Sequence, residues 1–205
     1  MPTIQTARIF VQARMSSDRF PGKVLAPFRG KPLIDHVMSA GMEVDDTVLV
    51  TSDQVSDDPL AMHGAARGWE VFRGDLDNVF KRFRDAGRAY PSQWIVRISG
   101  DSPLILADVV RTCLGAAHDS EHDVVTNVRP RCFPKGQSVE VIRASLFEAV
   151  PLDGMGDEER EHVTPYFYGR PERYKIQNVT RPDDFPIDMD CAVDTLEDLK
   201  RLEAS

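Results

Sequence analysis

The chain has 205 residues, of which 41% are hydrophobic, and this length supports one domain, residues 1–205, with a full core. Its 33 acidic and 25 basic residues give a net charge of −8, which disfavours binding to nucleic acid or to an anionic membrane surface. No segment approaches the roughly 20 apolar residues that cross a bilayer, and no secretory signal stands out, so we expect a cytoplasmic protein without membrane contact.

Apolar runs alternate with helical patterns from the first residues, which predicts strand-helix-strand units. The first four strands are expected at residues 8–13, 47–52, 70–73 and 94–99. These runs are mostly continuous in apolar content, as is typical of strands buried on both faces. The fold class is therefore α/β, with a mostly parallel central sheet flanked by helices.

After about residue 120 the pattern changes. Three more strands are expected at residues 122–128, 137–143 and 174–179. A short closing helix is expected from Thr195. In this helix the three leucines at positions 196, 199 and 202 are expected to face the core, and Glu197 and Arg201 to pair on the surface.

The segment VQARMSSDRFPGKVL, residues 11–25, forms a loop directly after the first expected strand. Open parallel sheets bind ligands outside the carboxyl ends of their strands, where this loop leaves the sheet. Arg14, Arg19 and Lys23 supply charge-assisted hydrogen bonds, and the small residues between them let backbone amides approach an anion. The loop therefore fits a polyphosphate, and a solvated loop with three cations is the competing interpretation.

Two carboxylates are expected near this loop. Asp101 follows a buried strand in RISGDSP, and Asp194 follows a short apolar run in AVDTLEDL. Two carboxylates that converge on a polyphosphate make a magnesium site, since Mg²⁺ is commonly held by one or two carboxylates plus phosphate oxygens. Taken alone, Asp194 fits the N-cap of the closing helix better than a metal ligand.

Segments spread over nearly the whole chain resemble the cytidylyltransferase family. They are VQARMSSDRFPGKVL and GKPL, VTSDQVSDD, VFRGDLDNVFKRF, VRISGDSPLI and VDTLEDL, in that order. The resemblance is to 3-deoxy-manno-octulosonate and acylneuraminate cytidylyltransferases, and most to the spore-coat-polysaccharide type. It implies a Rossmann-like nucleotidyltransferase fold similar to GT-A. It also implies transfer of CMP from CTP to an acidic acceptor, a keto-deoxy sugar acid or a small phosphonate, with release of pyrophosphate.

The resemblance further implies roles for the matching residues. Arg19, Lys23 and Asp101 would be catalytic, with Asp101 and Asp194 as ligands of Mg²⁺. The residues at the nucleotide would be Ala13, Arg14, Ser17, Thr51, Ser52, Asp53 and Arg73. The residues toward the acceptor would be Glu140, Glu161 and His162. Residues 130–175 would form an acceptor-side region through which two copies pair as a homodimer.

Two other classes of function compete with this one. A glycosyltransferase holds a metal-bound nucleotide sugar with an Asp-x-Asp sequence, and Asp188-Met189-Asp190 has that form. Its position near the C-terminus argues against it. A non-catalytic nucleotide-binding module is the third possibility, and the presence of both candidate metal carboxylates argues against that. His162 also fits a purely structural side chain.

Overall fold

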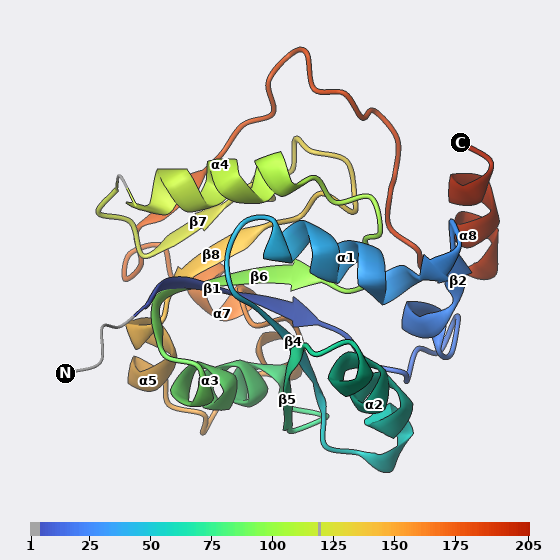
Figure 1. Cartoon of the computed structure of the whole chain (residues 1–205). Coiled ribbons are helices and arrows are strands. Elements are labelled where there is room, and N and C mark those ends of the chain that lie inside the picture. The colour runs from blue at the N-terminus through green and yellow to red at the C-terminus, as the bar shows by residue number, and fades with distance from the viewer. Residues whose placement is uncertain (1–4, 119) are drawn as a thin grey trace.

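The computed structural model describes residues 5–118 and 120–205. A seven-stranded sheet forms its centre, in the order β5-β4-β1-β6-β8-β7-β9 (Figure 1). The strands are β1 Gln5–Gln12, β4 Thr47–Ser52, β5 Glu70–Gly74, β6 Ser92–Ser99, β7 Val124–Thr126, β8 Glu140–Arg143 and β9 Ile176–Asn178. Neighbouring strands are parallel except where β8 pairs with β6 and with β7. The predicted α/β class with a mostly parallel sheet is confirmed.

Helices and short elements connect these strands. The helices are α1 Leu33–Met42, α2 Asp58–Ala66, α3 Val79–Ala89, α4 Ala107–His118, α5 Ser145–Ala149, α6 Asp157–His162, α7 Pro165–Tyr168 and α8 Leu196–Glu203. Two single turns, η1 Lys23–Leu25 and η2 Val55–Asp57, and the small hairpin of β2 Pro27–Phe28 and β3 Lys31–Pro32 complete the described part. Within that part, no helix is long and apolar enough to cross a membrane.

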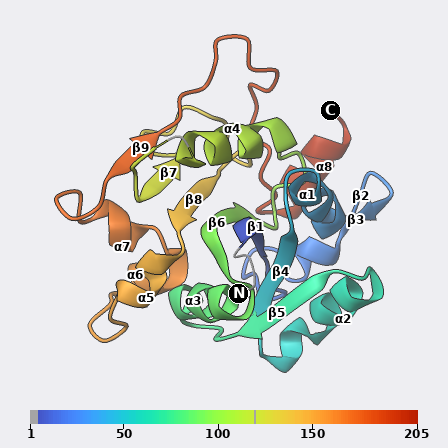
Figure 2. The same cartoon turned by 60° about the vertical axis from the view of Figure 1, so that its left-hand side comes forward.

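Strand β1 is buried on both faces, as its continuous apolar run predicts. Ile9 and Val11 face the core that contains α1 and α4, while Phe10 faces the core that contains α3, α5 and α7. Figure 2 shows the resulting layers, with α4 above the sheet and α3 below it. Because the first strands end at one edge of this sandwich, the loops that follow β1 and β6 lie together.

The closing helix differs from its prediction in two details. Leu199 and Leu202 are buried, but Leu196 is 44% exposed, because it occupies the first turn, ahead of the face that packs on the core. Arg201 donates to the carboxylate of Asp198 (3.2 Å) and to the carbonyl of Asp190 (2.7 Å), and the predicted pair with Glu197 is not among its contacts in the described residues.

Candidate functional site

A cavity of about 510 Å³ opens at the carboxyl ends of β1 and β6. We call it the loop cavity. Most of its wall comes from residues 12–14, 16–19 and Lys23, with Arg97, Ser99, Asp101, Glu161, His162 and Asp194 closing it. The basic loop, both candidate metal carboxylates and two of the predicted acceptor residues therefore meet in one place, although they are far apart in the sequence.

Two glycines allow the chain to form this edge. Gly22 has φ +74° and donates its N–H to the carbonyl of Met15 (2.8 Å), which closes the basic loop just before η1. Gly100 donates its N–H to the carbonyl of Gln12 (2.8 Å), and a Cβ on Gly100 would lie 2.7 Å from the Cβ of Ala13. A side chain there would push the ends of β1 and β6 apart, so glycine is required for this close approach.

Lys23 links the three segments of the site. Its Nζ donates to Asp101 Oδ2 (2.7 Å), to the carbonyl oxygen of Val193 (2.7 Å) and to Asp194 Oδ1 (3.3 Å). The backbone supports this arrangement, because the N–H of Val193 donates to the carbonyl of Asp101 (2.9 Å). Ser99 Oγ donates to the other oxygen of the Asp101 carboxylate (2.7 Å). The side chain of Lys23 is 10% exposed, so this is a built cluster and not a solvated loop.

Asp194 is not the N-cap of α8. That place belongs to Thr195, whose hydroxyl accepts the N–H of Asp198, while the Asp198 carboxylate accepts the N–H groups of Asp194 and Thr195. Burial acts to raise the pKa of Asp198, but hydrogen bonds from Thr195 and Arg201 outweigh it and lower that pKa to about 2. This capping box leaves the carboxylate of Asp194 free to face Lys23 and Arg19. A guanidinium nitrogen of Arg19 lies 2.9 Å from Asp194 Oδ1.

Asp57 is a residue of the site that the sequence reasoning missed. Its fully buried carboxylate accepts hydrogen bonds from the N–H of Met15 (2.7 Å), the hydroxyl of Thr51 (3.0 Å), and both the N–H (3.0 Å) and the hydroxyl (2.5 Å) of Ser52. It thereby joins the start of the basic loop to the end of β4. The only sequence signal is its place in VTSDQVSDD, where nothing distinguishes it from the exposed Asp53 or the half-buried Asp58.

Four predicted nucleotide residues lie outside the loop cavity in the described structure. The hydroxyls of Thr51 and Ser52 are fully buried on Asp57. Asp53 is exposed, and its carboxylate accepts from the side chain of Gln54 (3.0 Å). The guanidinium of Arg73 donates to the carbonyls of Ser52 (3.0 Å) and Gln54 (2.9 Å). These side chains hold the β4–η2 turn together, and their assignment to the cytidine stays a prediction without support from this geometry.

Glu140 is buried behind the wall of the loop cavity and does not line it. It pairs with Arg97, and its other oxygen accepts the hydroxyls of Thr164 (2.6 Å) and Tyr168 (2.8 Å). Burial, with the nearby Glu140 charge, raises the pKa of Tyr168 well above its usual value, so this hydroxyl stays protonated and donates. Arg97 in turn donates to the side chain of Gln12 (2.9 Å). Glu140 therefore orients Arg97, which sequence reasoning did not identify.

His162 and Glu161 do line the loop cavity, at the end of α6. The backbone turns sharply after them. Val163 has φ +65° and ψ −64°, and the N–H of Thr164 donates to the carbonyl of His162 (2.7 Å), which together make a γ-turn of the rare, strained type. This turn places His162 at the rim and sends Thr164 inward to Glu140.

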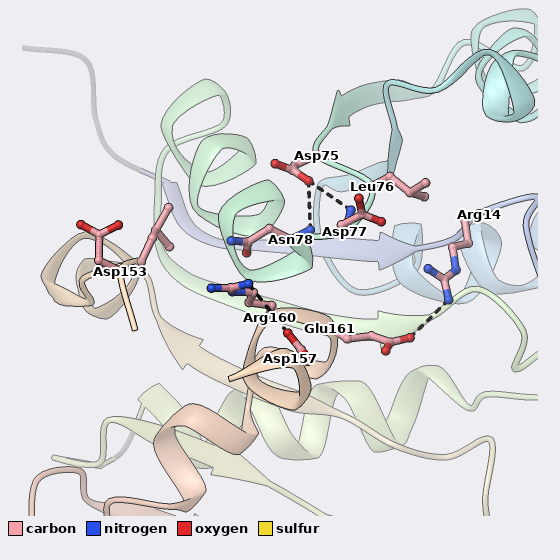
Figure 3. Close-up of a pocket in the computed structure, with 10 residues that line it drawn as sticks. Arg14, Asp75, Leu76, Asp77, Asn78, Asp153, Asp157, Arg160 and Glu161 are labelled. Carbon is pink, nitrogen blue, oxygen red and sulfur yellow. Dashed lines mark hydrogen bonds and ion pairs between the residues drawn. The ribbon is translucent and has the colours of Figure 1, made fainter. Parts of the chain in front are cut away.

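A second cavity, of about 760 Å³, lies beside the first, and we call it the acidic cavity. Figure 3 shows its boundary, where Arg14 and Glu161 point toward one another and pair at 3.3 Å; both line the two cavities. Its remaining charged wall residues are Asp75, Asp77, Asp153, Asp157 and Arg160. With five carboxylates against two guanidinium groups, this space suits a neutral or donor-rich molecule better than an anion.

The turn that follows β5 forms one side of the acidic cavity. Asp75 accepts the N–H groups of Asp77 (3.1 Å) and Asn78 (3.0 Å), and Asn78 caps α3 by accepting the N–H of Lys81 (2.8 Å). Beneath it, the fully buried Arg82 donates to the carbonyl of Asp75 (3.0 Å), and burial lowers the pKa of Arg82 to about 10. The turn is thus fixed from inside, with its polar side chains facing the cavity.

The Asp-x-Asp sequence lies elsewhere. Asp188 pairs with Arg181 (2.9 Å) and Asp190 with Lys135 (3.5 Å), around a separate open cavity of about 400 Å³. The residues that line this cavity include none that line the loop cavity, so the Asp-x-Asp pair does not join the cationic loop in one nucleotide site. The glycosyltransferase interpretation loses its only sequence support.

Open α/β sheets bind their ligands outside the carboxyl ends of the strands, and a cationic loop and two carboxylates at that place fit the class of nucleotide-binding transferases. The profile of one family, described as cytidylyltransferase, matches residues 9–204. The chain belongs to the cytidylyltransferase family, as the motifs in its sequence predict, and the family consists of nucleotidyltransferase enzymes.

Individual relatives agree with this assignment. The spore coat polysaccharide biosynthesis protein SpsF of Bacillus subtilis (strain 168) is 31% identical over 205 residues, covering 95% of this chain and 83% of SpsF. The solved structure of a cytidylyltransferase from Leptospira borgpetersenii is 27% identical with a TM-score of 0.90, covering 98% of this chain and 86% of that one. A CMP:2-keto-3-deoxy-manno-octonic acid synthetase complexed with CTP is 19% identical, with a TM-score of 0.74 and 98% of both chains covered. The last of these supports the fold alone.

Proposed function

We propose that this protein is a CTP-dependent cytidylyltransferase that transfers CMP to an acidic acceptor, a keto-deoxy sugar acid or a small phosphonate, and releases pyrophosphate. The observation that carries the proposal is the convergence on Lys23. The basic loop, Asp101 and Asp194 meet there within hydrogen-bonding distance, as the chemistry of a metal-bound polyphosphate requires. Had the two aspartates lain apart, the cations of the loop would have had no connection to a metal.

The residues around Lys23 fit a divalent cation such as Mg²⁺. The carboxylates of Asp101 and Asp194 and the carbonyl of Val193 offer oxygen ligands only, which is the donor set of a hard cation. In the described residues, no three acidic, histidine or cysteine side chains are placed so that together they could hold a metal ion, so phosphate oxygens would complete the coordination. When bound, the cation would neutralise charge on the phosphate groups.

The chain's own cations would do the remaining electrostatic work. In the proposed reaction an acceptor oxygen attacks the α-phosphorus of CTP, the bond to the bridging oxygen breaks, and pyrophosphate leaves with the bonding electrons. Arg19 and Lys23 would bind the departing pyrophosphate, while Arg14 would hold the nucleotide at the boundary between the cavities. Catalysis of this kind depends on position and charge and needs no covalent intermediate with the protein.

Charge also suggests where each substrate binds. The acidic cavity would repel a sugar acid or a phosphonate, but its carboxylates would accept hydrogen bonds from the amino group of cytosine and the hydroxyls of ribose. We therefore assign the nucleoside to the acidic cavity and the acceptor to the side of the loop cavity near Arg97 and His162. The pairing of two copies through residues 130–175 stays a prediction.

The test is a screen of the four nucleoside triphosphates against a panel of acceptors, read out as pyrophosphate release. We expect release with CTP, only in the presence of a divalent cation and an acidic acceptor. Binding of CTP without release for any acceptor would support the non-catalytic module instead. Release from ATP or GTP at the same rate would remove the preference for cytosine from the proposal.

A further inference from the structure

The ammonium of Lys23 has no hydrogen-bonding capacity left. An ammonium carries three N–H donors. Those of Lys23 meet three oxygens, on Asp101 (2.7 Å), Val193 (2.7 Å) and Asp194 (3.3 Å). A phosphate group could therefore contact this ammonium only if at least one of these oxygens gave up its contact.

These three oxygens are also the ones that would hold the divalent cation. The other oxygen of Asp101 is engaged by the hydroxyls of Ser99 (2.7 Å) and Ser102 (3.4 Å), so a metal ion would be left with the oxygen that faces Lys23. Lys23 and a metal ion would compete for the same partners, and their like charges would repel each other strongly at such a short distance in a partly buried site.

We propose that Lys23 acts as an internal cation that occupies the position of the divalent metal while no nucleotide is bound, and leaves it when phosphate groups bind. The proposal rests on the proposed function only in taking the ligand to be a metal-bound polyphosphate. Movement of the side chain is sufficient, because the backbone of Lys23 is fixed by its N–H bond to the carbonyl of Phe20 (3.2 Å) and by the turn at Gly22.

Two consequences follow. In the free protein Lys23 and Arg19 together balance the charges of Asp101 and Asp194, which avoids two unpaired carboxylates in a partly enclosed site. Metal and nucleotide then bind with positive coupling, because each removes the obstacle to the other: phosphates attract Lys23 away, and the metal takes over its oxygens. Lys23 thus has a positioning role in the order of binding, in addition to its proposed contact with pyrophosphate.

The experiment is a titration of the nucleotide-free protein with Mn²⁺ alone. Binding is measured by calorimetry and by the electron paramagnetic resonance signal of the free ion. Lys23→Met keeps an unbranched side chain, one atom shorter, and removes its charge. We expect this variant to bind one Mn²⁺ about 5- to 150-fold more tightly than the wild-type protein. Lys81→Met removes an ammonium of α3 that is paired with Asp85 (2.9 Å), outside the loop cavity and outside residues 130–175, and with the same change of net charge it should behave as wild type.

A double variant locates the ion. Asp101→Asn in the Lys23→Met background should abolish the gain, because it removes a ligand of the vacated position. If Lys23→Met does not fold, Lys23→Gln replaces it, since its amide donates to one carboxylate without carrying charge. In the wild-type protein, Mn²⁺ alone should leave the thermal unfolding midpoint unchanged at concentrations that raise it in the variant.

The proposal is overturned if wild type binds Mn²⁺ alone as tightly as the Lys23 variants do, or if the gain survives Asp101→Asn. None of these measurements needs CTP, an acceptor or turnover. If the protein does not transfer CMP, the Mn²⁺ measurements still test the role of Lys23. If the Mn²⁺ measurements contradict that role, the proposed transfer reaction is not affected.

Discussion

Removal of the Asp57 carboxylate should damage both the stability of the fold and the binding of nucleotide. Asp57 accepts four hydrogen bonds, and Thr51, Ser52 and Asp57 are all fully buried. Hydrogen bonds to a charged acceptor contribute about 1.5 to 3 kcal/mol each, and buried donors left without a partner carry a further desolvation penalty. Partial relaxation prevents simple addition, so we expect Asp57→Ala to lower the free energy of unfolding by about 3 to 5 kcal/mol.

Asp57→Asn is the more informative substitution because it keeps the shape of the side chain. Its amide oxygen still accepts, but its NH₂ group faces donors that the carboxylate satisfied, and we expect a loss of about 2 kcal/mol. The matched control is Asp53→Asn, four residues earlier. The Asp53 carboxylate is exposed and accepts only from Gln54 among the contacts described, so its loss should change stability by less than about 0.5 kcal/mol.

The effect on nucleotide binding comes through Met15. Its N–H bond to Asp57 (2.7 Å) fixes the start of the basic loop, while Lys23 and Asp101 are anchored independently. We therefore expect the dissociation constant of CTP to rise about tenfold in Asp57→Asn, which corresponds to about 1.4 kcal/mol, with a smaller change in kcat. Urea unfolding followed by circular dichroism and calorimetric titration with CTP measure the two quantities.

Two results would refute this reasoning. Equal stability of Asp57→Asn and Asp53→Asn would show that the four hydrogen bonds do not hold the β4–η2 turn. A destabilised variant with unchanged affinity for CTP would show that the turn does not position the basic loop.

Three further predictions test other parts of the site. Asp101→Ala should lower kcat for cytidylyl transfer by about 10² to 10³-fold, and near-normal turnover would exclude it from catalysis. The double variant with Asp188→Asn and Asp190→Asn should keep CTP turnover within about twofold, since these carboxylates line a separate cavity; a large loss would show that this pair takes part in the transfer reaction. Asp198→Asn should cost about 1 kcal/mol at neutral pH, after allowance for partial exposure. Because the pKa of Asp198 in the folded protein is lowered to about 2, the difference in unfolding free energy between wild type and variant should be complete above about pH 4 and shrink as the pH falls toward 2. Thermal unfolding of both proteins over this pH range measures the difference.

The parts of the fold that sequence could predict are those with a strong periodic signal. The continuous apolar runs of β1 and β4 depend on local sequence, and both strands lie within a few residues of where they were expected. The reversed direction of β8 has no such signal, because an apolar run looks the same in either direction and only the connections decide it. The exposure of Leu196 likewise depends on which turn of α8 reaches the core.

In the site, the successful predictions concern residues placed by strand ends. Lys23 and Asp101 lie together because the loops after β1 and β6 leave the same edge of a parallel sheet. Thr51 and Ser52 also follow this rule by position, yet their hydroxyls bind Asp57. Whether a side chain at the edge faces the cavity or the interior is decided by a partner such as Asp57. The burial of Asp57 depends on tertiary packing and cannot be read from the local sequence.

Three cations of the basic loop each pair with a carboxylate of the site in the absence of ligand. Arg14 faces Glu161, Arg19 faces Asp194, and Lys23 faces Asp101, so the free site is balanced before any ligand arrives. A triphosphate that engages these cations leaves carboxylates without partners, and unpaired carboxylates in a partly enclosed site are costly. A divalent cation restores the balance at the same oxygens. A requirement for metal and nucleotide together therefore follows from how the protein neutralises itself in their absence.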